Sequence, residues 1–508
     1  MMQRRLTRRG FVALLAAGAF SLTAGCIPRR PAGKKSTTRV VPALTSTPLP
    51  QRPLQALIDG AAASSTVRVP AGIYREQITI NKPITLLAEP GAEIRGSDVW
   101  TGWTKRGGYW VKPGLPDLGT YDVPALAGSD GRCNWPEQVI RDGQPLRQVR
   151  QHPGTGQFAV TSSREVVLAD DPSGHLIEVT TRMRWIVGAA SDVTIGGFRM
   201  RHAASPPQRG AIDCTGFDRW TIRDNVLSDA SGAVVFLAAG SGHQLLRNEV
   251  FNGGQEGLSL SGVRDSRILS NHVHDNNTEE FDPNWEAGGM KISHGADLTI
   301  QQNTFNLNLG AGLWFDIDST GARVLRNLVH HNTDTGIAYE ISERGLIQGN
   351  ACWENGWRVP TGTGAAGIFV NSSKTTQVLE NVLGWNPKGI MVMSQHRSDG
   401  FPSTGITVAR NVIASSDDFV PGSRFGLCWY QDYAGDLYRT EGDNHGDENR
   451  YWYTTPEGSV PRFRWTSNLT RLSQFNQTLG EHDGRYLSIE EKDQLLAQAG
   501  VPLNQEQH

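Results

Sequence analysis

The sequence predicts an all-β protein, a parallel β-helix solenoid in which each coil is one repeat. One observation is an Asn that recurs in eight similar segments, such as IRDNVLSD and VLRNLVHHN, at separations of 23, 23, 32, 24, 23, 31 and 30 residues. A fixed period of this size indicates stacked repeats. The other is that these segments alternate apolar and polar residues and break at Gly or Asn, which favours strands over helices. The recurring residues are Asn225, Asn248, Asn271, Asn303, Asn327, Asn350, Asn381 and Asn411.

A second Asn column follows the first by five residues. The basic coil is 23–24 residues long, and three coils carry insertions of seven to nine residues. Stacked amide side chains hydrogen-bond to one another along a solenoid axis, and Asn tolerates the left-handed backbone of a sharp turn. Both columns therefore predict coils in register. The second column comprises Asn276, Asn308, Asn332, Asn355 and Asn386.

The first 53 residues are expected to lie outside the folded domain. TRRGF, an apolar run and LTAGC together resemble a twin-arginine export signal with a bacterial lipoprotein cleavage box. The resemblance implies a signal at 1–26, lipidation of Cys26, and a protein exported and anchored at the outer face of the cell membrane or cell surface. Residues 27–53 are rich in Pro, Ser and Thr and predict a tether.

The remaining elements follow in order. Residues 54–97 open with the amphipathic LQALIDGAA and continue with short strands, which predicts an N-terminal cap helix and the first coils. Residues 98–185 are irregular and predict an inserted β-rich subdomain. The β-helix itself is expected over 186–435. Solenoid ends need covers, so 436–508, with the helical pattern SIEEKDQLLAQAG, is expected to cap the C-terminal end.

Charge and cysteine content exclude some functions. Residues 1–35 hold eight basic and no acidic residues, which leaves 41 basic against 51 acidic residues in the rest of the chain, about −10. This balance argues against a nucleic-acid partner. The four cysteines after Cys26 are far apart and lack the spacing of a zinc site. Buried free thiols are the expectation for them, with disulfides as the alternative outside the cell.

Each coil also contains a strand that begins at Gly, as in GLWFDID and GIAYEIS. When these strands are aligned on Gly, the first, third and fifth following residues are expected to point inward, and the second and fourth outward. The fourth-position column then brings Asp316 beside Glu340, with Asp318 further along the same strand. The second-position column brings Lys291 beside Trp314.

Two neighbouring carboxylates indicate chemistry or a bound cation, because like charges side by side destabilise a sheet. Close carboxyl groups push their pKa values apart, which suits one acid and one base or nucleophile. The alternatives are a solvated pair or a partial calcium cage formed by Asp316, Asp318 and Glu340. Lys291 is either an ion-pair partner of Asp316 or a base, and Glu286 either pairs with Lys291 or meets substrate.

The largest insertion, HDNNTEEFDPNWEAGG, precedes Lys291 and is expected to wall the site. His274 and His330 share a column with Asn306 between them, and are either further catalytic residues or surface residues at a turn. Exposed tryptophans offer flat apolar faces to sugar rings. The expected substrate-binding residues are Trp285, Trp314, Trp353, Asn306 and Asn371.

FDPNWEAGGMK, GLWFDID and YEIS resemble the repeats of bacterial secreted proteins of the right-handed parallel β-helix, pectate lyase-like superfamily, over roughly residues 54–435. The resemblance implies extracellular polysaccharide chemistry. The acidic outer columns make a glycoside hydrolase that acts on a neutral or weakly charged glycan through Asp316 and Glu340 the first hypothesis. A uronate lyase or epimerase with Lys291 and calcium, and a non-catalytic glycan binder, are the alternatives. FDPNWE also resembles the Asp-Pro-His signature of alginate epimerases, but Asn284 replaces the histidine, so that role is not carried over.

Overall fold

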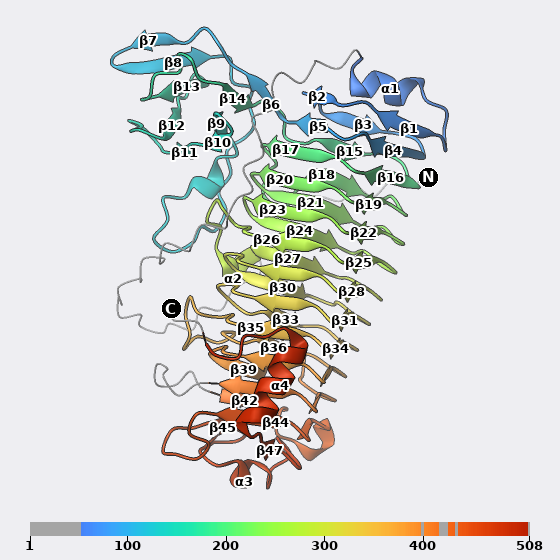
Figure 1. Ribbon diagram of the computed structural model, residues 1–508, viewed down its shortest axis with the longest axis vertical. Coiled ribbons are helices and arrows are strands. Elements are labelled where there is room, and N and C mark those ends of the chain that lie inside the picture. The colour runs from blue at the N-terminus through green and yellow to red at the C-terminus, as the bar shows by residue number, and fades with distance from the viewer. Residues whose placement is uncertain (1–51, 398–400, 416–424, 432–434, 506–508) are drawn as a thin grey trace, which may run out of the picture. The chain divides into compact units, whose positions relative to one another are not determined.

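The computed structural model describes residues 52–397, 401–415, 425–431 and 435–505. The expected export signal, Cys26 and nearly all of the tether lie outside the described residues. In the described part, the strands stack into three long parallel sheets of 12, 13 and 13 strands, the predicted β-helix (Figure 1). Each coil contributes one strand to each sheet, so residues one repeat apart become neighbours.

Sheet 1 runs from β1 (Thr66–Val69) to β43 (His445–Asp447). Sheet 2 includes β23 (Glu249–Gly253), β26 (His272–His274), β29 (Thr304–Asn306), β32 (Leu328–His330), β35 (Ala351–Trp353), β38 (Val382–Gly384), β41 (Val412–Ser415) and β44 (Arg450–Tyr453). Sheet 3 includes β21 (Ala233–Ala238), β24 (Glu256–Ser261), β27 (Gly288–Ser293), β30 (Ala311–Asp316), β33 (Ile337–Glu340), β36 (Ile368–Asn371), β39 (Lys388–Ser394) and β42 (Phe425–Gln431).

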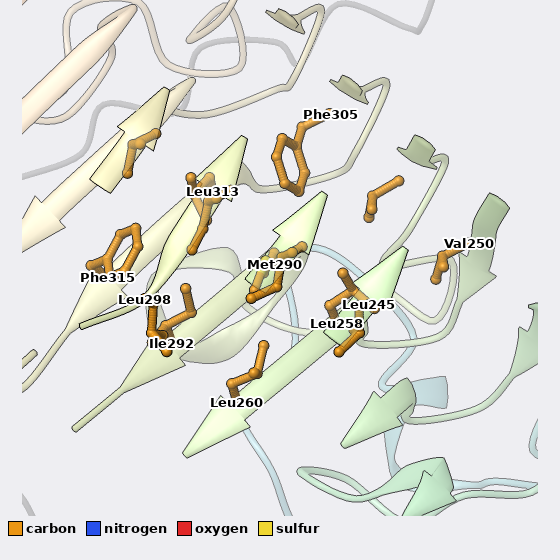
Figure 2. Packing of buried hydrophobic residues seen from close by; sticks show 14 of the residues in the cluster. Leu245, Val250, Leu258, Leu260, Met290, Ile292, Leu298, Phe305, Leu313 and Phe315 are labelled. Atoms are coloured by element: carbon orange, nitrogen blue, oxygen red, sulfur yellow. The ribbon is translucent and has the colours of Figure 1, made fainter. Parts of the chain in front are cut away.

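The interior of the coils is filled by aliphatic and aromatic side chains from all three sheets (Figure 2). Leu313 and Phe315 of β30 point into this core, as does Phe305 of β29. Identical positions of successive coils stack on one another, for example Leu313 on Ile337. The alternation predicted for the Gly-led strands is therefore confirmed at the first and third positions.

The fifth position of these strands was predicted wrongly. Ile317 is 39% exposed, and its φ of 43° lies in the left-handed region, as does the φ of Ile341 at the same place in the next coil. The chain turns here toward the next sheet, so the two-residue alternation of the strand ends at the fourth position. Asp318 consequently lies in this turn and not on the strand.

The Asn ladder runs through the turns between sheets 1 and 2. The backbone N–H and the Nδ2 of Asn303 donate to Oδ1 of Asn327 at 2.9 and 3.0 Å, and Asn327 repeats both contacts to Asn350 at 2.9 Å. The remaining Nδ2–H of Asn327 donates to the Ile300 carbonyl at 2.9 Å. Each buried amide thus satisfies its own coil and its neighbour, which explains why the sequence repeats Asn at this period.

A carboxyl group, not an amide, terminates this ladder. The backbone N–H and Nδ2 of Asn449 donate to the two oxygens of Glu481 at 3.3 and 2.9 Å, and the Tyr451 hydroxyl also donates to Glu481. Glu481 is fully buried, and burial raises its pKa to about 7. The folded protein therefore binds this proton more tightly than the unfolded chain does.

We expect Glu481 to make the folded state pH-sensitive. Because its folded pKa is raised, its stabilising contribution is present below about pH 4.5 and is lost as the pH rises through about 7, a change of about 3 kcal/mol. Urea unfolding of the wild type and Glu481→Gln between pH 5 and 8.5 measures this. The variant is expected to lose less stability across that range, and parallel pH curves for the two proteins would contradict the expectation.

The two ends of the β-helix are closed by different elements. The helix α1 (Leu54–Gly60) covers the first coils with Leu54 and Ile58. At the other end β43 still pairs in parallel with β40 (Thr407–Ala409), and β44 with β41, so the coils continue beyond the predicted boundary at 435. The short helix α3 (Leu472–Phe475) then adds Leu472 and Phe475 to the core.

The C-terminal helix α4 (Ile489–Ala499) does not cap the end of the solenoid as expected. Its Leu496 packs with Trp353 and Trp385 on the outer face of sheet 2, and Lys492 lies 4.4 Å from the ring centre of Trp452. The helix begins with a capping box at Ser488 and ends at Gly500 in a left-handed conformation. The helix α4 therefore packs against apolar residues that point outward from sheet 2. The repeat pattern of the sequence did not predict this contact.

The residues between β5 (Ala92–Arg95) and β15 (Ile186–Gly188) form a four-stranded antiparallel sheet and a five-stranded mixed sheet with a core of their own. This segment contacts the insertion before Lys291: Ala125 forms an antiparallel bridge with Phe281, and Arg132 lies 3.5 Å from Glu279. Cys133, Cys214, Cys352 and Cys428 are buried free thiols in the described chain. No helix among the described residues is long and apolar enough to cross a membrane.

Candidate active site

The outward columns of sheet 3 fall where the sequence predicted them. Lys291 pairs in register with Trp314, and Ser293 with Asp316. Phe315 pairs with Tyr339, so the next residues, Asp316 and Glu340, are neighbours on adjacent coils. This arrangement follows from the equal spacing of the carboxylates and the coils.

Asp316 is held by a cation. Its Oδ2 lies 3.1 Å from Nζ of Lys291, and its Oδ1 accepts the backbone N–H of Ile317 at 2.9 Å. The side chains of Lys291 and Asp316 are 9% and 11% exposed, so both charges are largely removed from water. Lys291 and Asp316 therefore form a close ion pair with little access to water, and Lys291 fixes the position of the carboxylate.

Glu340 has a different environment. Its Oε2 accepts the indole N–H of Trp314 at 3.2 Å, and its Oε1 accepts the amide N–H of Asn371 at 2.9 Å and pairs with the Arg397 guanidinium. Burial and the nearby charge of Asp316 raise the pKa of Glu340 above its usual value, although Arg397 and Lys291 oppose the shift. The two carboxyl groups are thus distinguished by their surroundings: Lys291 pairs with Asp316, whereas burial and Asp316 raise the pKa of Glu340.

Lys291 lies between the carboxylate of Asp316 and the inserted loop that carries Trp285. Its Nζ donates to the Trp285 carbonyl at 3.2 Å and lies 3.7 Å from the ring centre of Trp314. Burial works against its charge, but three carboxyl groups together raise the pKa of Lys291 above its usual value. They belong to Asp316, Glu286 and Glu256, in decreasing order of effect. Of the two interpretations of Lys291, the ion pair with Asp316 is confirmed, and a base at neutral pH is disfavoured.

Sequence reasoning missed Glu256, the residue just before the Gly-led strand of its coil. It is 1% exposed, and neither of its carboxyl oxygens has a hydrogen bond of ordinary geometry with the described residues. Burial and the nearby Glu286 raise the pKa of Glu256 well above its usual range, which favours the neutral acid. Glu286 ends the helix α2 (Pro283–Glu286) and accepts a hydrogen bond from Gln208. Glu256 directly precedes Gly257, on which the strands were aligned, so it lay outside the columns that were compared. Its acidic side chain was the only signal that could have drawn attention to it.

Arg397 was missed as well, because it lies beyond the end of β39 and outside the repeat. It contacts Glu340 and donates to Oε1 of Gln395 at 2.7 Å, and Gln395 also accepts from Asn371. Arg397 thus reaches Glu340 from a coil that is not its nearest neighbour. Residues of this kind have no periodic signature in the sequence.

The partial calcium cage is not assembled. Asp318 is exposed in the turn, and Asp316 is already paired with Lys291. Calcium needs six to eight oxygen ligands, and an ammonium group at the same carboxylate competes for that position. Asp318 therefore lies apart from the carboxyl cluster.

The histidines lie on sheet 2, not on the sheet that carries the carboxylates. His274, Asn306 and His330 pair in one column, as predicted. Burial and the adjacent His331 lower the pKa of His330 to about 3, and its ring stacks on Trp353 at 4.1 Å. Asn306 is 9% exposed and bonds to Nε2 of His272 at 2.8 Å. None of these contacts reaches Asp316 or Glu340.

The expected substrate-binding residues divide into two groups. Trp353 is 7% exposed beneath α4 and Asn371 is 1% exposed, so the prediction that they meet a sugar directly is wrong. Trp285 stacks on Phe281, with ring centres 6.4 Å apart, and packs toward the inserted subdomain. Trp314 is partly exposed beside both carboxylates, although it also packs against a buried apolar cluster that includes Phe369.

Comparisons with known proteins agree on the fold. A family model for a right handed beta helix region matches residues 210–413. The structure of XylC in complex with xylose matches with a TM-score of 0.54 and 17% identity, over 81% of this chain and 73% of that one. The A-module of the Azotobacter vinelandii mannuronan C-5 epimerase AlgE4 matches with a TM-score of 0.49 and 12% identity, over 82% and 93% of the two chains. A glycoside hydrolase matches with a TM-score of 0.42 and 10% identity, over 82% and 92%.

No curated protein matches the sequence. At these identities the likeness concerns architecture, and a shared fold does not fix a reaction. The three stacked parallel sheets, the matched region and the XylC structure agree with one another. The chain is a right-handed parallel β-helix protein.

Proposed function

We propose that the protein is a glycoside hydrolase whose catalytic groups are Asp316 and Glu340. The observation that carries this proposal is that two carboxyl groups on adjacent coils have opposite surroundings. Lys291 holds Asp316 at 3.1 Å, whereas burial and Asp316 itself raise the pKa of Glu340. Glycoside hydrolysis requires one protonated and one ionised carboxyl group on either side of the scissile bond.

In this mechanism Glu340 donates its proton to the glycosidic oxygen as the bond to the anomeric carbon breaks. Asp316 stabilises the positive charge that develops on the sugar and then acts as nucleophile or as the base for a water molecule. Lys291 holds the Asp316 carboxylate in position through their ion pair, and the Trp314 N–H orients the carboxyl group of Glu340. XylC, the similar protein solved with xylose, agrees with a sugar ligand for this fold.

A second candidate is a lyase or epimerase that acts on a uronate polymer. Arg397 favours it, because a guanidinium beside Glu340 offers charge for a substrate carboxylate. The raised pKa of Lys291 opposes it, because a lysine that stays protonated is a poor base for the sugar C5 proton. This candidate would also need a cation such as calcium to neutralise the uronate, and the cage of Asp316, Asp318 and Glu340 is not assembled in the structure.

A panel of neutral and uronate glycans, scored for two products, separates the candidates. Hydrolysis gives new reducing ends that do not absorb ultraviolet light, whereas elimination gives unsaturated ends that do. If the protein is a lyase that needs calcium, the unsaturated ends should stop forming after chelation. We expect reducing ends alone, and their formation should persist in EDTA. Absorbing products would favour the lyase. Retention on a polysaccharide gel with neither product would indicate a glycan-binding protein.

We also propose that the protein acts outside the cytoplasm on a lipid anchor. The proposal rests on the twin-arginine pattern and on LTAGC, which ends at Cys26. Cys26→Ala is expected to abolish labelling by an alkyne fatty acid and to move the protein from the membrane fraction. The matched control is Cys133→Ala, which removes a buried cysteine far from the signal. Equal labelling of the Cys26 variant and the wild type would overturn the proposal.

A further inference from the structure

A cluster of metal-ligating side chains lies on the outer face of sheet 2, which the proposed reaction does not use. One ring nitrogen each of His272 and His274 and one carboxylate oxygen of Glu249 lie within 4.8 Å of one another. The two histidines are two residues apart on β26, so both project from the same face. Glu249 is the in-register partner of His272 on β23. The cluster therefore joins two successive coils.

The ring of His274 is oriented as a ligand. Its Nδ1 lies 2.8 Å from the carboxylate of Asp275, which fixes the proton on Nδ1 and leaves the lone pair on Nε2. Nε2 is buried, has no hydrogen-bond partner among the described residues, and faces Oε1 of Glu249 at 3.6 Å. A buried imidazole nitrogen that faces a carboxylate and has no hydrogen-bond partner needs an explanation, and a cation held between the two groups provides one.

His272 is arranged in the same manner. Its Nε2 lies 2.8 Å from the amide oxygen of Asn306, which accepts the N–H and leaves Nδ1 as the free nitrogen. The rings of His272 and His274 stack with centres 4.1 Å apart, and Phe251 stacks on the other face of His274 at 5.1 Å. Both ligand rings are thus held by neighbours that would not themselves bind metal.

The distance between His274 and Glu249 suits a tetrahedral transition metal, and the third ligand atom lies within 4.8 Å of both. Zinc binds imidazole nitrogen at about 2.0–2.1 Å, which places two ligand atoms of a tetrahedral site about 3.4 Å apart. The 3.6 Å between Nε2 of His274 and Oε1 of Glu249 is close to this value. Two imidazoles and one carboxylate suit zinc better than calcium or magnesium, which prefer oxygen ligands alone.

We propose that Glu249, His272 and His274 bind one divalent transition metal ion of the zinc class, with Asp275 and Asn306 as the groups that orient the histidines. Glu249 and His272 are exposed, so a fourth position stays open to water or to a ligand from solution. The ion would link the coils that carry β23 and β26. This site is separate from the proposed catalytic carboxylates and stands without them.

Zinc titration of the metal-stripped full chain by calorimetry tests the proposal. We expect one ion per chain and a rise in the melting temperature on binding. His272→Gln with His274→Gln is expected to abolish both effects, and Asp275→Asn to weaken binding by about 10- to 100-fold through loss of orientation. His294→Gln, an exposed histidine on another face, is the matched control and should bind as the wild type does.

Cobalt absorption provides a second readout, because imidazole ligation changes the visible spectrum of the ion. The wild type and His294→Gln should both show this change, and the double variant should not. Unchanged zinc affinity in the double variant would overturn the proposal, as would binding of calcium in place of zinc. Circular dichroism of the double variant should match that of the wild type, since both side chains lie outside the core.

Discussion

Glu340→Gln is expected to lower the rate of hydrolysis of a natural glycan by a factor of about 10³, within the usual range for loss of a general acid. Glu340 would only protonate the leaving group, and an acidic phenol leaves without that proton. The rate of hydrolysis of an aryl glycoside with such a leaving group should therefore fall much less in Glu340→Gln. Asp316→Asn should lower the rate of hydrolysis of both substrates by a factor of about 10³ or more, since the positive charge that develops on the sugar then has no carboxylate to stabilise it. Rates of both variants on both substrates measure this difference.

The pH profile provides an independent test. If Glu340 acts as the acid, kcat/KM of the wild type falls as the pH rises through its raised pKa, because the proton to be donated is lost. That limb of the profile should be absent in the residual activity of Glu340→Gln. If instead Asp316→Asn alone abolished the limb, the two roles would have to be exchanged.

Asp318→Asn is the matched control for both substitutions. It makes the same chemical change two residues from Asp316, on an exposed side chain outside the cluster, so activity should be retained. Asp316→Asn also removes the partner of a buried lysine, which costs about 3–5 kcal/mol, so its folding must be checked by circular dichroism. Full activity of folded Asp316→Asn or Glu340→Gln on a natural glycan would show that the site is placed wrongly.

Asn327→Ala is expected to destabilise the fold by about 3–5 kcal/mol. It leaves the backbone N–H and one Nδ2–H of Asn303 without an acceptor in a fully buried place. It also removes the side-chain Nδ2 donors of Asn327 to the Ile300 carbonyl and to Oδ1 of Asn350. Each buried polar group without a partner costs about 1–3 kcal/mol. The midpoint of urea unfolding measures the loss.

Arg323→Gln is the control on the same coil, because this side chain is exposed and its loss should change stability by less than about 0.5 kcal/mol. A ladder that contributes only to folding specificity would give Asn327→Ala the same midpoint as the control. That result would contradict the view that the repeated Asn residues stabilise the coils.

Much of the fold and part of the site could be read from the repeat. Parallel pairing places residues one coil apart about 4.8 Å from one another, so equal sequence spacing becomes adjacency in space. The ladder from Asn225 to Asn411 could be predicted for this reason, as could the pairing of Lys291 with Trp314 and the closeness of Asp316 and Glu340. The column of His274, Asn306 and His330 follows from the same rule.

The tertiary structure decided what surrounds these columns. Arg397 and Glu256 meet the site from positions that have no counterpart in the other coils, and α4 covers Trp353 from the end of the chain. The two histidines of β26 point toward Glu249 and not toward the carboxylates of sheet 3. The sequence by itself determined the register of the coils, because strand pairing is periodic. Burial, ion pairing and protonation depend on insertions and side-chain directions that are not periodic, so they were determined only once the coils, the loops and the terminal helix had packed together.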